Sequence, residues 1–168
     1  MTPKHIKVLI GVVVVVLVAV SAFFYFSGEK PVTVETGDCV RVEKDSTTLV
    51  KAGCDAPEAV FTVAKKVDGP YGDCPKPGHY VPYPPEDRYQ AGQQTLCLMM
   101  NVKKGDCLSA ITSVENARRV ECAAAEFQVL GILEDKVDPY SCTDVDGTNS
   151  GFIYAEPPRV ICGKSNAP

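Results

Sequence analysis

The pattern of hydrophobic and polar residues divides the chain into one continuous apolar segment and a longer region of short alternating segments. Residues Val8 to Phe26 carry no charge. As a helix this segment would span about 28 Å, which is close to the hydrocarbon thickness of a bilayer. Lys4 and Lys7 precede it and Glu29 follows it. The positive-inside rule therefore predicts a cytoplasmic N-terminus at residues 1–7, a single-pass transmembrane helix at 8–26, and an extracellular remainder.

A cleaved signal peptide is the alternative interpretation of the same segment. The sequence Val20-Ser21-Ala22 would serve as a cleavage site. The apolar run is, however, longer than the usual hydrophobic region of a signal peptide, so we favour an uncleaved signal anchor followed by a linker at 27–36. Both alternatives place the remainder of the chain outside the cytoplasm.

Beyond the linker, short alternating segments predict a mainly β structure. Val40 to Glu43 alternates apolar and polar residues, a turn-like segment follows, and Thr47 to Gly53 leads to Cys54. This pattern predicts a hairpin with Cys39 and Cys54 at its open ends. Two further strands are expected at 59–67 and 95–100.

The same order of features occurs twice. Gly37-Asp38-Cys39 returns as Gly105-Asp106-Cys107, offset by 68 residues. This offset also aligns the second and third cysteines of the two copies. The fourth cysteines align when the second copy is given a loop that is three residues shorter. We therefore interpret residues 37–101 and 102–168 as tandem repeats, each a small disulfide-bonded β unit.

The cysteine usage predicts structural disulfides. An even number of cysteines at repeated spacings after a hydrophobic N-terminus is typical of a disulfide framework. No C-x-x-C sequence is present, and no two cysteines lie close enough along the chain for a typical zinc site. If each repeat closes on itself in the same way, three pairing schemes remain. The hairpin argument favours first with second and, by elimination, third with fourth: Cys39–Cys54, Cys74–Cys97, Cys107–Cys122 and Cys142–Cys162.

Charge and motif content make several function classes unattractive. The chain has a net charge of -4, and without a basic cluster it is a poor candidate for binding nucleic acid. The segment Asp144-Val145-Asp146 departs from the calcium-binding EF-hand pattern. We expect no catalytic residues, no cofactor and no metal site.

The loop between Cys74 and Cys97 is the main difference between the repeats. It is rich in proline, which favours extended backbone without sheet hydrogen bonds. Its aromatic side chains could form an exposed contact surface, because loops carry function more often than strands do. A plain connection is the alternative. The candidate binding residues are His79, Tyr80, Tyr83 and Tyr89.

Three motifs carry a resemblance to a known family. They are Gly37-Asp38-Cys39, Cys54-x-x-Pro57-Glu58-Ala59 and the segment Thr95 to Leu98, each with a counterpart in the second repeat. The pattern resembles the LppU-like family of exported actinobacterial proteins, and the Gly-Asp-Cys arrangement is similar to the septum-formation domain. The resemblance implies a location in the cell envelope and no particular reaction.

Together these observations predict a transmembrane helix followed by two tandem disulfide-rich β units. We expect a non-catalytic, membrane-anchored protein of the bacterial cell envelope with a structural or binding role, whose partners include envelope or septal proteins. An envelope enzyme with a site between the two repeats is the alternative.

Overall fold

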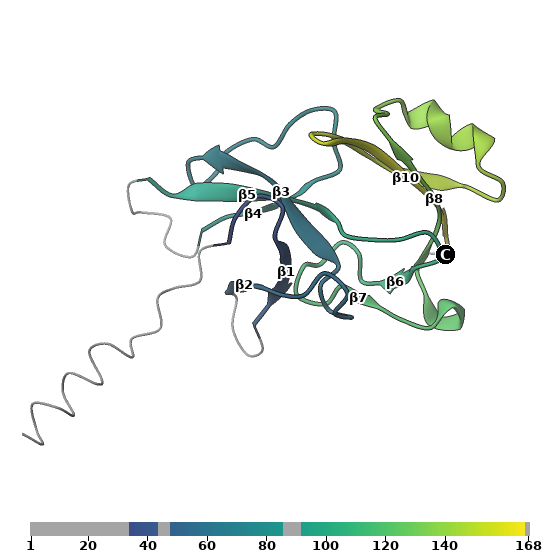
Figure 1. Ribbon diagram of the computed structural model, residues 1–168, viewed down its shortest axis with the longest axis horizontal. Coiled ribbons are helices and arrows are strands. Elements are labelled where there is room, and N and C mark those ends of the chain that lie inside the picture. Colours follow the sequence, from purple (N-terminus) through teal and green to yellow (C-terminus); the bar gives the residue numbers. More distant parts are fainter. Residues whose placement is uncertain (1–33, 44–47, 86–91, 167–168) are drawn as a thin grey trace, which may run out of the picture. The chain divides into compact units, whose positions relative to one another are not determined.

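The computed structural model describes residues 34–43, 48–85 and 92–166, which belong to one compact unit, Val34–Pro168. The segment predicted to cross the membrane, Val8–Phe26, lies outside the described residues. Within the described ranges no helix has the length and apolar character needed to cross a membrane. Strands dominate this part of the chain (Figure 1), so the prediction of a mainly β fold is confirmed.

The first repeat forms a five-stranded antiparallel sheet. Its strands lie in the order β2-β1-β3-β5-β4. The predicted hairpin is present, with Val40 paired to Lys51 and Val42 to Leu49. The strand bounds are β1 Cys39–Val42, β2 Leu49–Lys51, β3 Phe61–Asp68, β4 Val81–Tyr83 and β5 Gln94–Met100.

The second repeat forms a sheet with the corresponding order, β7-β6-β8-β10-β9. Identical strand order in the two sheets is what a duplicated unit should give. Two short 3-10 helices, η1 (Cys122–Ala124) and η2 (Pro139–Asp144), lie in the connections before and after β8. The strand bounds are β6 Cys107–Ser109, β7 Arg118–Arg119, β8 Phe127–Glu134, β9 Ser150–Ala155 and β10 Pro158–Ser165.

Four disulfides close the repeats, and they confirm the predicted disulfide framework. Their Cα–Cα distances lie between 5.0 and 5.6 Å, within the usual range for this bond. The pairing is also the one that the hairpin argument favoured, and all eight cysteines are used. The bonds are Cys39–Cys54, Cys74–Cys97, Cys107–Cys122 and Cys142–Cys162.

One detail of the proline-rich loop differs from the sequence expectation. The many prolines between Cys74 and Cys97 predicted a loop without sheet hydrogen bonds. In the structure, Val81–Tyr83 of this loop forms strand β4 and pairs with β5. The strand tolerates Pro82 because it lies at the edge of its sheet, where one side of the backbone needs no partner strand.

A single main hydrophobic core joins the two sheets. Each small sheet has too little apolar surface to build a large core alone, and packing sheet against sheet provides one. The repeats are therefore two sheets around shared side chains rather than two separately packed units. Fully or nearly fully buried members of this core are Val40, Phe61, Leu98 and Met100 from the first repeat and Leu108, Phe127, Tyr154 and Ile161 from the second.

Candidate functional site

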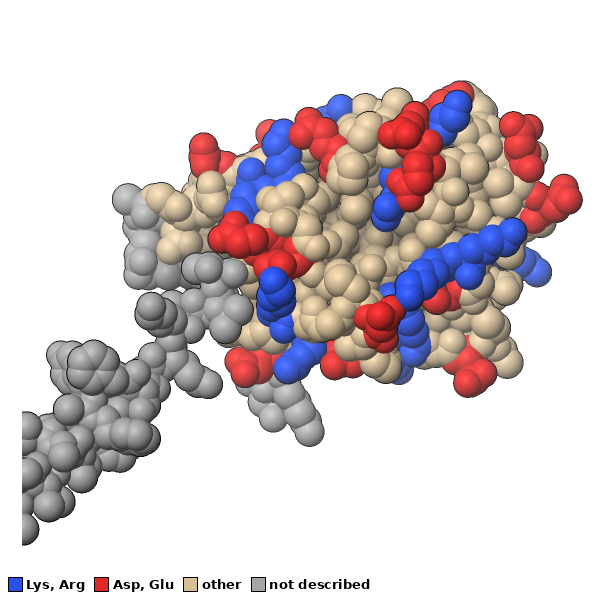
Figure 2. Space-filling view, in the orientation of Figure 1, with Lys and Arg blue, Asp and Glu red and all other residues tan. Residues whose placement is uncertain are grey.

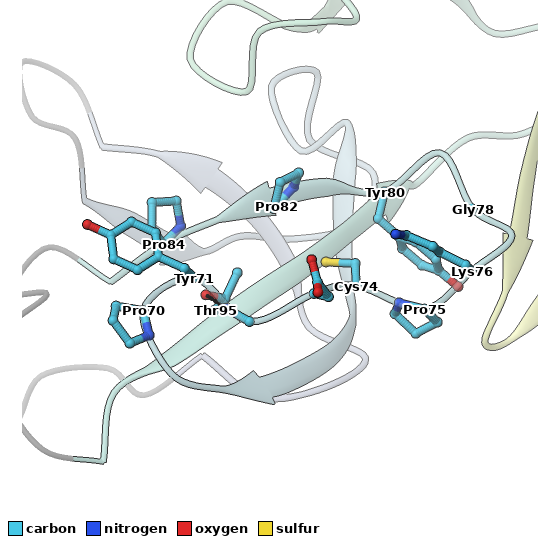
Figure 3. A pocket seen from close by; sticks show the side chains of 12 residues that line it. Pro70, Tyr71, Cys74, Pro75, Lys76, Gly78, Tyr80, Pro82, Pro84 and Thr95 are labelled. Atoms are coloured by element: carbon cyan, nitrogen blue, oxygen red, sulfur yellow. Dashed lines mark hydrogen bonds between the residues drawn. The ribbon is translucent and has the colours of Figure 1, made fainter.

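A hollow of about 510 Å³ lies beside β4 and β5 of the first repeat (Figure 3). Its walls come from the turn after β3, from the proline-rich loop and from β5. Cys74, which forms a disulfide with Cys97, also contributes to the wall. The lining residues are Pro70, Tyr71, Gly72, Asp73, Cys74, Pro75, Lys76, Gly78, Tyr80, Pro82, Pro84 and Thr95.

The walls of the hollow are held by hydrogen bonds and by ring constraints. The buried Thr95 hydroxyl donates to the Gly69 carbonyl (2.8 Å) and accepts from the Gly72 N–H (3.2 Å). Gly72 lies so close to β3 that a Cβ there would come within 2.6 Å of the Val67 side chain. The four proline rings fix their own φ angles. This hollow is thus largely formed before any ligand arrives, which lowers the entropic cost of binding.

The mouth of the hollow combines an aromatic ring with two charges. Tyr71 is 74% exposed, and the side chains of Asp73 and Lys76 are also exposed. Proline and tyrosine rings offer apolar surface, the Asp73 carboxylate can accept hydrogen bonds, and the Lys76 ammonium can donate them. Such a site fits a partner that presents an apolar group beside polar atoms.

The predicted contact residues His79 and Tyr80 do not form a free aromatic surface. Tyr80 is only 9% exposed, and its hydroxyl donates to the Glu156 carbonyl (3.0 Å) and accepts from the Glu156 N–H (2.7 Å). Its ring packs edge-on against Tyr154, with centroids 5.2 Å apart. These contacts reach across to the second repeat.

His79 is exposed but also engaged with the second repeat. The backbone N–H of His79 donates to the Ile153 carbonyl (2.8 Å), and the ring Nδ1 of His79 accepts from the Ile153 backbone N–H (2.9 Å). The neighbouring Gly78 makes an antiparallel bridge with Tyr154. The segment 78–80 therefore lies along the edge of β9.

The other two predicted contact residues are placed differently. Tyr83 lies in β4 and is partly buried. Tyr89 lies outside the described residues. Sequence reasoning overlooked Tyr71, which directly follows the turn signal Asp68-Gly69-Pro70 and is therefore on the surface.

A second hollow, of about 260 Å³, adjoins the disulfide of the second repeat. It shares with the first hollow an exposed tyrosine near the third cysteine of the repeat, here Tyr140, which is 77% exposed. It has no proline in its wall and is smaller. Its lining residues are Tyr140, Cys142, Thr143, Thr148, Asn149, Ser150 and Gly151.

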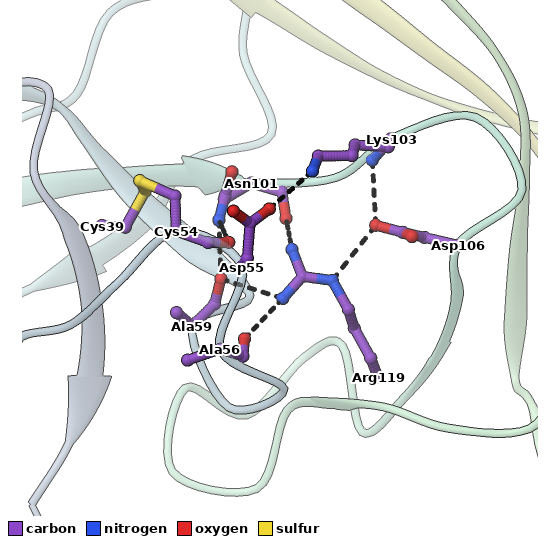
Figure 4. A network of polar contacts seen from close by, with 9 residues as sticks. All are labelled: Cys39, Cys54, Asp55, Ala56, Ala59, Asn101, Lys103, Asp106 and Arg119. Carbon is purple, nitrogen blue, oxygen red and sulfur yellow. Dashed lines mark hydrogen bonds and ion pairs between the residues drawn. A yellow bond between two sulfur atoms is a disulfide. The ribbon is translucent and has the colours of Figure 1, made fainter.

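A polar network lies between the repeats, where the alternative interpretation of the sequence placed an enzyme site (Figure 4). At its centre the Arg119 guanidinium donates to the carbonyls of Ala56 (2.7 Å) and Asn101 (2.6 Å). It also donates to the Ala59 carbonyl (3.4 Å) and to the Asp106 carboxylate (3.1 Å). The side chain is 18% exposed. Through these four hydrogen bonds Arg119 ties carbonyls of the first repeat to Asp106 of the second, so it holds the repeats together.

Two aspartates have lowered pKa values: Asp55, near this network, and Asp38, beside the hairpin of β1 and β2. The hydrogen bond from the Lys103 ammonium lowers the pKa of Asp55, and the charge of Arg119 adds to the effect. The hydrogen bond from Lys51 lowers the pKa of Asp38, with a further bond from the Glu35 N–H. In the second repeat, burial raises the pKa of the Tyr154 hydroxyl. Each shift has a structural cause, and none of the three groups lines the hollow.

Within the described residues, no group of three or more His, Cys, Asp and Glu side chains could hold a metal ion. No protein-family model, no curated protein and no solved structure matches this chain. Its function is therefore inferred from its own residues, with the hollow in the loop between Cys74 and Cys97 as the candidate site.

Proposed function

We propose that this protein is a non-catalytic, membrane-anchored binding protein of the bacterial cell envelope. Its contact site is the hollow around Tyr71, and the uncharged segment 8–26 is its membrane anchor. The disulfides support a location outside the cytoplasm, because such bonds persist there and all eight cysteines are paired. A protein of the envelope or of the septum is the partner that this location favours.

The observation that carries the proposal is the preformed apolar wall of the hollow. Prolines, a disulfide and the buried Thr95 hold the wall, and Tyr71 stands exposed at its mouth. Ordering a flexible loop on binding costs conformational entropy and weakens association. A wall that is already fixed avoids this entropy loss and is therefore suited to binding. Exposed aromatic residues beside pockets are also enriched at protein contacts.

Photo-crosslinking from position 71 tests this proposal. Tyr71 is replaced by p-benzoylphenylalanine in the full chain in living cells, and the matched control carries the same group at Tyr140, which has nearly the same exposure. We expect a discrete crosslinked product from position 71 that is weakened by Lys76→Glu. Absence of any product at 71, or equal products from 71 and 140, would contradict a specific site in the hollow.

The anchor is tested separately. Intact mass of the purified full-length protein is expected to include residues 1–26, and the protein is expected to stay with the membrane in alkaline carbonate. A mass that lacks about the first 22 residues, as a signal-peptide cleavage site predicts, would show cleavage and remove the anchor from the proposal.

Replacement of the whole proline-rich segment would not be a clean test of binding. Replacing the whole segment 76–86 by a short turn would delete His79 and Tyr80, which contact the second repeat. Loss of binding in that variant would not separate a missing contact surface from a damaged fold. Single substitutions at exposed positions of the hollow do not have this defect.

A further inference from the structure

We propose that the hollow around Tyr71 recognises an extended peptide segment that presents, in spatial order, an apolar, a cationic and an anionic side chain. The inference rests on the proposed function for the use of the hollow as a contact site, and it adds the chemistry of the partner. The residues that carry it are Tyr71, Asp73 and Lys76, which all line the hollow.

The lining of the hollow is elongated and differs in character along its length (Figure 3). Tyr71 and Pro84 lie toward one end, and Lys76 lies toward the other. Asp73 lies between Tyr71 and Cys74 in the chain, and Cys74 is near the middle of the same view. The lining therefore runs from an aromatic and apolar end, past a carboxylate, to an ammonium group.

Most charged side chains of the first repeat are neutralised by ion pairs within the protein. Asp73 and Lys76 differ, because no ion pair or side-chain hydrogen bond joins either of them to another residue in the described part of the chain. Both are exposed, so a partner can reach both charges. The ion pairs of the first repeat are Arg41–Glu58, Lys51–Asp38, Lys65–Glu156, Lys66–Glu35 and Lys103–Asp55.

The hollow of the second repeat shows that the repeat can be built without these charges. It adjoins the equivalent disulfide and has the exposed Tyr140 in its lining. None of its described lining residues is charged. A disulfide and an exposed tyrosine thus occur beside both hollows, whereas the two opposite charges belong to the first. We therefore assign these charges to recognition rather than to the construction of the wall.

The hollow favours recognition through side chains of an extended segment. Pro82 in the edge strand β4 has no N–H, which hinders addition of a partner strand through backbone hydrogen bonds at that position. An apolar side chain can pack on the rings of Tyr71 and Pro84. The Asp73 carboxylate can accept from a cationic group, and the Lys76 ammonium can donate to an anionic one. Charges at an exposed rim contribute more to specificity than to affinity.

Selection from a random library of short peptides tests the proposal. The full-length chain in phosphatidylcholine nanodiscs is the bait for peptides displayed on phage, and empty nanodiscs remove nonspecific binders. We expect enriched peptides in which an aromatic or aliphatic residue is followed, in either chain direction, by Lys or Arg and then by Asp or Glu. Absence of enrichment, or enrichment without this order of charges, would overturn the proposal.

Two charge reversals make the test specific. Asp73→Lys is expected to select an anionic residue in place of the cationic one, and Lys76→Glu a cationic residue in place of the anionic one. Affinity for a peptide selected by the unsubstituted chain, measured by fluorescence anisotropy, is expected to fall roughly threefold to tenfold in each variant. The matched control Lys164→Glu reverses an exposed charge on β10, outside the hollow, and should change neither result. Unchanged selection by either reversal would overturn the proposed charge recognition.

The outcome can be separated from that of the crosslinking experiment. Peptides with the expected charge order but no crosslinked product at position 71 in cells would keep the chemistry of the hollow and remove its proposed use in the envelope. A crosslinked product at position 71 without the charge order would keep the binding proposal and overturn the partner chemistry. The first selection uses the unsubstituted chain, so it stands even where a variant fails to fold.

Discussion

At the scale of single residues, Arg119 shows how one side chain can join two repeats. It lies in the short edge strand β7, yet its guanidinium contacts carbonyls at Ala56, Ala59 and Asn101, all in the first repeat. Its backbone N–H also donates to the Pro57 carbonyl (3.0 Å). The planar fork of arginine suits several acceptors at once, which a lysine ammonium on a flexible stem does not.

Substitution of Arg119 by lysine keeps the charge and removes the fork. We expect a loss of about 1–3 kcal/mol in the free energy of unfolding, because the first-repeat carbonyls that accept from Arg119 lose their hydrogen-bond donors. Denaturant unfolding followed by circular dichroism measures the loss. Arg118→Lys is the matched control on the same strand, since Arg118 is exposed and should change stability little. Equal effects at both positions would show that the fork is unimportant.

At the scale of elements, the first repeat protects the edges of the second sheet. Unpaired edge strands invite association with other chains. The segment 78–79 covers β9, and Pro57 accepts a hydrogen bond from β7. The edge strand β4 of the first sheet instead carries Pro82, which has no N–H to offer. The proline-rich loop therefore has a structural role in addition to the hollow that it lines.

Gly78 is the position where this cover is most easily disturbed. A Cβ at Gly78 would overlap the ring of Tyr80. We expect Gly78→Ala to push the loop away from β9 and to cost about 1–3 kcal/mol, as overpacking usually does. The matched control is Gly53→Ala, where an added Cβ meets nothing within 4 Å and the backbone needs no positive φ. Thermal unfolding compares the two, and a stable Gly78→Ala protein would contradict the close packing.

At the scale of the whole molecule, the two sheets depend on each other. The main core mixes side chains from both repeats, such as Leu98 and Met100 with Phe127 and Tyr154. The Tyr154 hydroxyl accepts from the Met100 N–H (3.3 Å), which ties the second sheet to the last strand of the first. A single repeat would expose to water the core side chains that the other repeat covers.

Separation of the repeats should therefore destroy cooperative folding. We expect fragments 34–101 and 102–168, each with its disulfides formed, to lack a sharp thermal transition, whereas the joined pair unfolds in one step. Calorimetry of the fragments and of the intact chain makes the comparison. A sharp transition in either fragment alone would show that its sheet has a sufficient core of its own.

Stability should also fall in acid. The pKa values of Asp38 and Asp55 are lowered below their ordinary value of 3.8 in the folded protein. The unfolded chain therefore takes up protons first, so this contribution is present above about pH 4 and is lost as the pH falls through the folded pKa values. Asp55 is exposed and Asp38 is partly buried, but each pairs with an exposed lysine that water screens, so a small effect is expected. Unfolding of the protein and of Asp55→Asn between pH 5 and 2 checks it, and the variant should show the shallower dependence.

Features that depend on neighbours along the chain could be predicted from the amino-acid sequence alone. Alternating residues indicated the hairpin of Cys39 and Cys54, and the repeated spacing of cysteines indicated the duplication. The hairpin and the duplication together favoured the disulfide pairs that the structure contains. Strand periodicity and the short span of a hairpin disulfide depend on residues close along the chain, so the local pattern was sufficient for these features.

The exposure of the loop side chains and the contacts between the repeats could not be predicted from the sequence and depend on the three-dimensional fold. Tyr80 is buried because Glu156 and Tyr154, more than seventy residues later, lie against it. Tyr71 is exposed because Thr95 holds the turn around it against β5. Arg119 reaches four acceptors that no spacing rule connects to it. These placements depend on packing between distant segments, and hydrophobic periodicity carries no information about which distant segments pack together.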